Sequence, residues 1–240
     1  MKSRQPVERG AENGMVKKAG SAQRRSESLS REQIVEASIA LLDSGGESGL
    51  TFRALSGRLA TGPGTIYWHI DNKRDLLTAA CDAVVARATD PAHDGAAPRA
   101  AIRELARRLF ETIDAHPWVG AALTRAPGAL PMVRILERLG RQVQALGVPA
   151  RAQWAAVSAL SSYILGVSGQ NAANALIARE LDADRDALLG EVATVWAALD
   201  PDAYPFTRGI AAQLRAHDDR DDFLAGIDLI VGGIEAAHGR

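Results

Sequence analysis

The sequence lacks cysteine pairs and the common metal-binding and catalytic motifs. Its 240 residues contain one cysteine, Cys81, so no disulfide can form within the chain, and we expect a reducing compartment, the cytoplasm. The five histidines are scattered along the chain, and neither H-E-x-x-H nor G-x-S-x-G occurs. We therefore predict no enzymatic activity, no bound metal and no cofactor.

Long apolar runs are also scarce. The first thirty residues hold no apolar stretch of the signal-peptide type, so we expect no export. Residues 152–178 carry no charge and are long enough to cross a bilayer, but their Gln, Ser and Asn side chains would be costly in lipid. We predict no membrane span.

Aromatic residues make up only 5% of the chain, whereas 47% of the residues are hydrophobic, mainly Ala and Leu. This composition favours an all-α fold with a real core.

The formal net charge of -1 hides an asymmetry between the two ends of the chain. Residues 1–75 hold twelve Lys or Arg and nine Asp or Glu, whereas the remainder holds sixteen and twenty. A basic N-terminal end indicates nucleic-acid binding there. Residues 1–29 contain hardly any apolar residue and are predicted to be disordered when free. Two hypotheses stay open for residues 17–25. In the first, they follow DNA phosphates or reach into a minor groove beside the motif; in the second, they form a solvated tail without a role.

Residues 50–77 form the stretch around which the chain is organised. Leu55 and Leu59 have helical spacing, residues 61–64 form a Gly/Pro turn, and residues 65–69 read Thr-Ile-Tyr-Trp-His. Hydroxyl, imidazole and aromatic groups on such a short helix can contact phosphates and base edges. Taken alone, Tyr67 or Trp68 could also belong to a surface turn whose aromatic rings cover a small core. The pattern predicts a helix-turn-helix.

Residues 30–77 resemble the DNA-binding domain of the TetR family of transcriptional repressors. The run from Thr65 to His69, followed by Asn72, Lys73, Arg74, Leu76 and Leu77, is close to the family's tetracycline-repressor type. The resemblance implies a three-helix DNA-binding domain over residues 30–76 and a helical ligand-binding and dimerisation domain over residues 77–240. It implies DNA contacts from Thr51, Phe52, Arg53, Pro63, Gly64, Thr65, Tyr67, Trp68, His69 and Lys73. The chain departs from that type at Pro63 and Gly64, so the operator sequence does not carry over.

Capping residues and apolar spacing predict the helices. A capping box at Ser30 and Gln33 opens a first helix over residues 31–43, which Gly45 and Gly46 end. Thr51 caps the next helix, and Asp71 or Asn72 caps a longer fourth one. Residues 90–98 have the composition of a linker. Further helices are predicted around residues 102–113, 133–146, 152–178, 188–196 and 210–214, and over 222–237.

Small residues recur on the charge-free helix at Ser158, Ser162, Gly166 and Gly169, so another helix can approach that face closely. The last helix is similar to the one that ends the family's ligand-binding domain. We predict a homodimer through the helices around residues 153–177 and 222–237, which together form a four-helix bundle.

The resemblance also implies a small-molecule effector in a cavity among the fifth to eighth helices. Its predicted lining is Leu105, Leu109, Trp118, Met132, Tyr163, Val167, Gln170 and Asn174, and ordinary core is the alternative for each. Gln170 stands where the tetracycline-repressor type has a metal-binding carboxylate, and His116 lies about a turn too early. An uncharged or weakly polar effector is therefore expected rather than a magnesium chelate.

These features predict a homodimeric transcriptional regulator, a repressor that a small-molecule effector releases from a palindromic double-stranded operator. The alternative is a helical ligand- or protein-binding dimer without specific DNA binding. Specific operator binding would exclude it.

Overall fold

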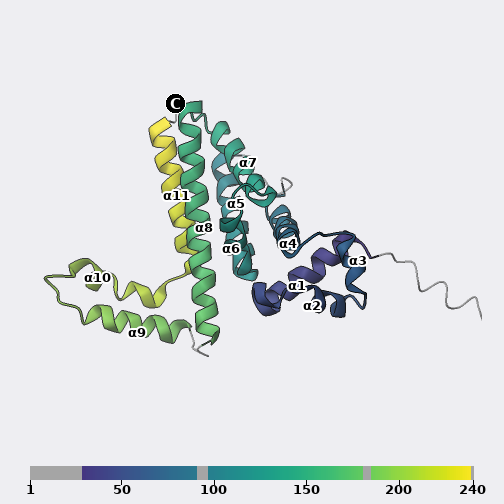
Figure 1. Ribbon diagram of the computed structural model, residues 1–240. Helices are drawn as coiled ribbons and strands as arrows, with labels where there is room; N and C mark the ends of the chain where they lie inside the picture. The colour runs from purple at the N-terminus through teal and green to yellow at the C-terminus, as the bar shows by residue number, and fades with distance from the viewer. Residues whose placement is uncertain (1–28, 91–96, 181–184, 239–240) are drawn as a thin grey trace, which may run out of the picture.

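The computed structural model describes residues 29–90, 97–180 and 185–238, and every regular element in these ranges is a helix (Figure 1). The elements are α1 (Arg31–Gly49), α2 (Phe52–Arg58), α3 (Pro63–Tyr67), α4 (Lys73–Ala88), α5 (Pro98–Ala115), α6 (Trp118–Arg125), α7 (Leu130–Ala145), α8 (Ala150–Glu180), α9 (Arg185–Ala197), α10 (Pro205–Ile210), the 3₁₀ helix η2 (Gln213–Ala216) and α11 (Asp219–His238). The all-α prediction is confirmed.

The N-terminal unit consists of α1, α2, α3 and the first turn of α4. The sequence correctly predicts the side chains that cap its helices. The Ser30 hydroxyl accepts from the Gln33 N–H at 3.2 Å, and the Gln33 side chain accepts from the Ser30 N–H at 2.9 Å. Thr51 caps α2 by accepting from the Ala54 N–H, and Asn72 caps α4 by accepting from the Asp75 N–H. These side chains satisfy backbone donors that have no partner inside the helix.

Two boundaries differ from the predictions. The first helix does not end before Gly45 but continues to Gly49, with Gly46 as a kink at φ 59° inside it. The glycine pair thus bends the helix, because Gly46 adopts a positive φ at little steric cost. A short helical turn follows Gly46 and ends at Gly49. The turn before α3 ends at Gly62, because Pro63 is already the first helical residue, a position where its missing N–H costs nothing.

Helix α4 connects the N-terminal unit to the rest of the molecule. It packs against α1 on one side and against α5, α6 and α7 on the other. Asp82 of α4 forms an ion pair with Arg134 of α7 at 2.7 Å, and buried residues of α1 to α8 and α11 form one continuous hydrophobic cluster. A movement of α4 would therefore be transmitted between the two units.

The C-terminal helices pack around α8 and α11, which run side by side (Figure 1). Helix α11 begins at Asp219, three residues earlier than predicted, because the Asp218 side chain accepts from the Asp221 N–H and caps it. The helices predicted around residues 102–113, 133–146, 152–178 and 188–196 are confirmed as α5, α7, α8 and α9. Helices α9 and α10 extend away from the bundle on the side opposite α1–α3 (Figure 1).

Two predicted features lie outside the described residues, wholly or in large part. These are the basic arm over residues 1–29 and the linker over residues 90–98.

Candidate nucleic-acid interface

The inner side of α3 anchors this short helix to the N-terminal unit. Ile66 is completely buried and Ile70, just after the helix, is 4% exposed. The His69 and Ile70 N–H groups donate to the Ile66 carbonyl oxygen, which continues the turn beyond Tyr67. Two isoleucines thus fix which face of the segment points outward.

The outer side of α3 displays polar and aromatic side chains. Thr65, Tyr67, Trp68 and His69 are all exposed, as are Pro63 and Gly64 at the start of the helix. Trp68 has 89% of its surface exposed, and Tyr67 has 52%. Since indole and phenol rings usually bury most of their area, such a display is typical of a surface that binds a partner.

Tyr67 is held in place by Phe52, the first residue of α2. Their ring centroids are 4.4 Å apart and the rings are 15° from parallel. Phe52 itself is half-buried and packs against the core. The sequence places both residues among the predicted DNA contacts, but the stack between them, across fifteen positions, has no signal in the sequence.

The ends of α2 and α4 carry the remaining predicted contacts. Thr51 and Arg53 are exposed at the start of α2. Lys73, the first residue of α4, is also exposed, and its ammonium donates to the Glu47 carbonyl oxygen at 2.7 Å. The structure therefore brings all ten predicted residues onto the N-terminal unit, nine of them exposed and Phe52 half-buried.

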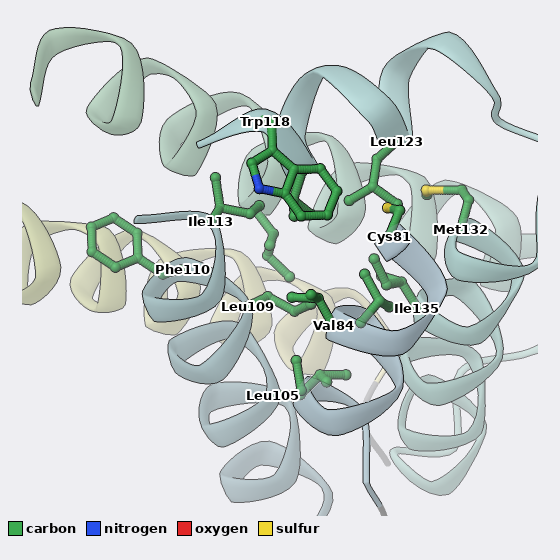
Figure 2. Close-up of a cluster of buried hydrophobic side chains, with 14 of the residues drawn as sticks. Cys81, Val84, Leu105, Leu109, Phe110, Ile113, Trp118, Leu123, Met132 and Ile135 are labelled. Atoms are coloured by element: carbon green, nitrogen blue, oxygen red, sulfur yellow. The ribbon is translucent and has the colours of Figure 1, made fainter. Parts of the chain in front are cut away.

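The residues predicted to line an effector cavity fall into two groups. Leu105 and Leu109 of α5, Trp118 of α6 and Met132 of α7 lie together in a buried cluster, at most 9% exposed (Figure 2). Figure 2 shows Leu109 beside Val84, near the centre of this cluster.

The four predicted residues on α8 lie on more open surfaces. The Tyr163 hydroxyl donates to the Phe223 carbonyl oxygen of α11 at 3.2 Å, its ring stacks on the Phe223 ring, and Val167 is half-buried. Burial raises the pKa of Tyr163, with the nearby Asp222 carboxylate adding to the effect. Gln170 and Asn174 are exposed, apart from the buried cluster.

A polar contact between the two units is missing from the sequence-based prediction. The Asp43 carboxylate of α1 accepts from the Trp118 indole N–H at 2.8 Å and lies 2.7 Å from Nδ1 of His116. His116 and Trp118 flank the start of α6, so this carboxylate fixes that helix on the N-terminal unit. More than seventy residues separate Asp43 from His116 and Trp118 in the sequence, so no local pattern predicts the contact.

The described ranges contain no cluster of three or more His, Cys, Asp or Glu side chains that would hold a metal ion. Among the helices of these ranges, none is both long and apolar enough to cross a membrane.

Comparison with known proteins decides the family. The model of the bacterial regulatory proteins of the tetR family matches residues 34–80, and the model of the tetracyclin repressor-like C-terminal domain matches residues 91–238. The chain belongs to the TetR family. The two matches correspond to the helix-turn-helix unit and to the C-terminal bundle of this TetR protein.

Relatives and solved structures agree with this assignment. An HTH-type transcriptional regulator of Saccharopolyspora erythraea is 32% identical over 139 residues, which are 58% of this chain and 59% of the relative. The class D tetracycline repressor protein of Escherichia coli is 42% identical over 62 residues, 26% of this chain and 28% of that protein. The chain thus spans less than two thirds of these curated relatives.

A solved transcriptional regulator of Streptomyces coelicolor, described as a TetR, is 54% identical. The match covers 88% of this chain and 99% of that one, with a TM-score of 0.80. ActR of Streptomyces coelicolor in complex with actinorhodin is 20% identical, with a TM-score of 0.73 over 88% and 98% of the two chains, and shows the shared fold.

Proposed function

We propose that this TetR protein is a transcriptional repressor that binds a palindromic operator as a homodimer and is released by a small-molecule effector. In this proposal residues 30–76 read DNA, whereas residues 77–240 form the dimer and bind the effector. Because the target is chromosomal DNA, the protein would act in the cytoplasm.

One observation carries the DNA-binding part of the proposal. Helix α3 turns Ile66 inward and leaves Thr65, Tyr67, Trp68 and His69 exposed on a helix of five residues and its C-terminal turn. A helix-turn-helix protein uses the N-terminal residues of such a helix to contact base edges in the major groove. Phe52 holds Tyr67 in position, and Arg53 and Lys73 supply positive charge for phosphates.

The exposed face of the long C-terminal helices supports the homodimer. On α8, Ser162 and Gly166 are exposed, and on α11 the Leu229 side chain is 78% exposed. An exposed leucine, together with small residues on a helix that carries no charge from residue 152 to residue 178, fits close packing against a second copy. Two-fold symmetry would then present two α3 helices to two half-sites of a palindrome.

The buried cluster of Figure 2 supports the effector part of the proposal. Leu105, Leu109, Trp118 and Met132 would form an apolar lining if α5, α6 and α7 separated around a ligand. The solved ActR complexes hold (S)-DNPA or actinorhodin, so this fold accommodates small organic molecules in at least one protein.

The proposal is tested by selecting binding sites from fragmented genomic DNA of the source organism. The purified protein is mixed with the fragments, and the bound fragments are sequenced. We expect enrichment of one palindromic motif whose half-sites lie about one helical turn, ~34 Å, or a multiple of it apart. Recovery of fragments without a shared motif would contradict the proposal and would favour the ligand- or protein-binding dimer.

A further inference from the structure

A cavity of about 520 Å³ lies where the helix-turn-helix unit meets the C-terminal helices. Its walls come from the first half of α4, from the end of α6 and the start of α7, and from Glu47 at the end of α1. Small-molecule sites commonly enclose about 300–1,000 Å³. None of the eight residues predicted for the effector lines this cavity, which adjoins the buried cluster of Figure 2 but has its own lining.

The floor of the junction cavity is apolar. Leu77 and Cys81 of α4 and Leu123 of α6 contribute to it, and Cys81 and Leu123 are each 2% exposed. Figure 2 shows Cys81 and Leu123 together beside Met132, at one edge of the buried cluster. Burial raises the pKa of the Cys81 thiol to about 12, because apolar surroundings disfavour the charged thiolate. The floor therefore suits the hydrocarbon part of a ligand.

The rim of the cavity is positively charged. Lys73, Arg74 and Arg125 line it together with one carboxylate, that of Glu47. Glu47 is already engaged, because its carboxylate pairs with Arg125 and its carbonyl oxygen accepts from the Lys73 ammonium. In the part of the chain that the structure describes, Arg74 forms no hydrogen bond or ion pair. A rim with a surplus of two positive charges favours an anion.

We infer that the junction cavity binds a small amphipathic organic anion. Its apolar body packs on Leu77, Cys81 and Leu123, and its carboxylate, sulfonate or phosphate lies at Arg74 and Lys73. An uncharged molecule of the same shape would fill the floor but leave Arg74 without a counter-charge. Charge-assisted hydrogen bonds to a guanidinium are about twice as strong as neutral ones, so the anion is preferred.

Occupation of this cavity would affect the contacts that join the two units. Both ends of α6 are attached to α1, through Asp43 with His116 and Trp118 and through Glu47 with Arg125. A ligand anion at the rim would compete with Glu47 for its cationic partners and with operator phosphate for Lys73. This regulatory consequence rests on the proposed function, whereas the binding site itself does not.

The test titrates the full-length protein, without DNA, with 8-anilino-1-naphthalenesulfonate, an aromatic anion whose fluorescence rises in apolar sites. N-phenyl-1-naphthylamine, which has the same aromatic body without the sulfonate, is the neutral comparison. Arg74→Gln removes the unpaired cation, and Ala126→Trp places an indole in the cavity wall. Arg141→Gln, an equal charge change at an exposed position of α7, is the matched control.

We expect Arg74→Gln to weaken binding of the sulfonate at least about tenfold and to leave binding of the neutral probe unchanged. Ala126→Trp should abolish binding of both probes, and Arg141→Gln should change neither. Equal affinity for the sulfonate in the wild type, Arg74→Gln and Ala126→Trp would overturn the inference, as would a wild-type dissociation constant above about 1 mM.

A second titration separates this inference from the proposed function. With an operator in hand, the sulfonate should raise the dissociation constant of the wild-type operator complex and leave that of Ala126→Trp unchanged. If the first titration succeeds and no operator is found, the binding site stands and the proposed function fails. If an operator is found and the first titration fails, the proposed function stands and the binding site in the junction cavity fails.

Discussion

At the scale of single residues, the interface depends on Tyr67, because this side chain is both exposed and held by a neighbouring ring. We expect Tyr67→Ala to weaken operator binding at least tenfold, about 1.4 kcal/mol or more, since it removes the contact group and the partner of Phe52. Fluorescence anisotropy with a labelled operator measures this loss.

The matched control is Tyr204→Ala, because Tyr204 is also 52% exposed but lies in the turn before α10. Its operator affinity should equal that of the wild type. Equal losses in both variants would mean that truncating an exposed tyrosine acts through folding, and the assignment of Tyr67 would be wrong.

Cys81 gives a pH-dependent prediction at the same scale. Burial raises the pKa of its thiol to about 12, with the neighbouring Asp82 carboxylate contributing, whereas a thiol in the unfolded chain ionises near pH 8.5. The folded state thus holds the proton more tightly, and this stabilisation, complete below about pH 8.5, is lost as the pH rises toward about 12.

We therefore expect the stability of the wild type relative to Cys81→Ala to fall between pH 8 and pH 10. Urea unfolding of both proteins at the two pH values measures the difference, and groups that titrate in both proteins cancel. A difference that does not change with pH would show that the thiol is not buried as described.

At the scale of elements, the Thr51 side chain caps α2 by a hydrogen bond. Thr51→Ala should lower the free energy of unfolding by about 1 kcal/mol, because the Ala54 N–H loses its acceptor, whereas Thr51→Ser keeps the hydroxyl and most of the stability. Chemical denaturation of the three proteins measures this. Equal stabilities of Thr51→Ala and Thr51→Ser would contradict the capping role.

The contact between α8 and α11 depends on a glycine. A Cβ atom built on Gly226 would overlap the Tyr163 hydroxyl, and Tyr163 cannot easily move because it stacks on Phe223 and donates to its carbonyl oxygen. Gly226→Ala should therefore destabilise the protein by about 1–2 kcal/mol, because overpacking exceeds the gain in helix propensity.

Gly140 of α7 provides the control for this prediction. A Cβ atom there meets nothing within 4 Å, so Gly140→Ala should be neutral or stabilising by up to about 1 kcal/mol. Urea unfolding at one fixed protein concentration compares the two variants. Gly226→Ala as stable as Gly140→Ala would show that the two helices are less closely packed.

Element boundaries show what can be predicted from sequence and what cannot. The starts of α1, α2 and α4 were predictable because a cap is a contact over three residues, between Ser30 and Gln33 for example. The end of α1 was not, because the turn after Gly46 is held by Arg125 and Lys73, which contact Glu47 from distant parts of the chain. The Phe52 stack and the Asp43 contacts escaped prediction for the same reason.

The proposed DNA contacts follow from the resemblance, and the structure brings them together on one unit. The proposed effector lining was harder to predict, because apolar spacing marks a side chain as buried without saying whether it faces a cavity or the core. Arg74 and Arg125 line the junction cavity from two helices, and their sequence separation gives no hint of this.

At the scale of the whole molecule, binding of one protein to both half-sites of a palindrome requires a dimer. We expect Leu229→Glu to convert the dimer to monomers, because it places a charge on the exposed apolar face of α11. Sedimentation equilibrium measures the mass. Leu130 is also exposed but lies on α7, so Leu130→Glu should leave the dimer intact. A wild-type protein that sediments as a monomer would contradict the proposed assembly.

A competition measurement tests whether the protein binds DNA in a sequence-specific way. A fluorescent duplex with the palindrome selected from genomic fragments is titrated with the wild-type protein, in the presence of excess unlabelled duplex of scrambled sequence and equal length. We expect the anisotropy increase to survive the scrambled competitor and to be abolished by an equal excess of unlabelled palindrome. Equal displacement by both competitors would show binding to phosphate charge alone, and the protein would not be the repressor proposed here.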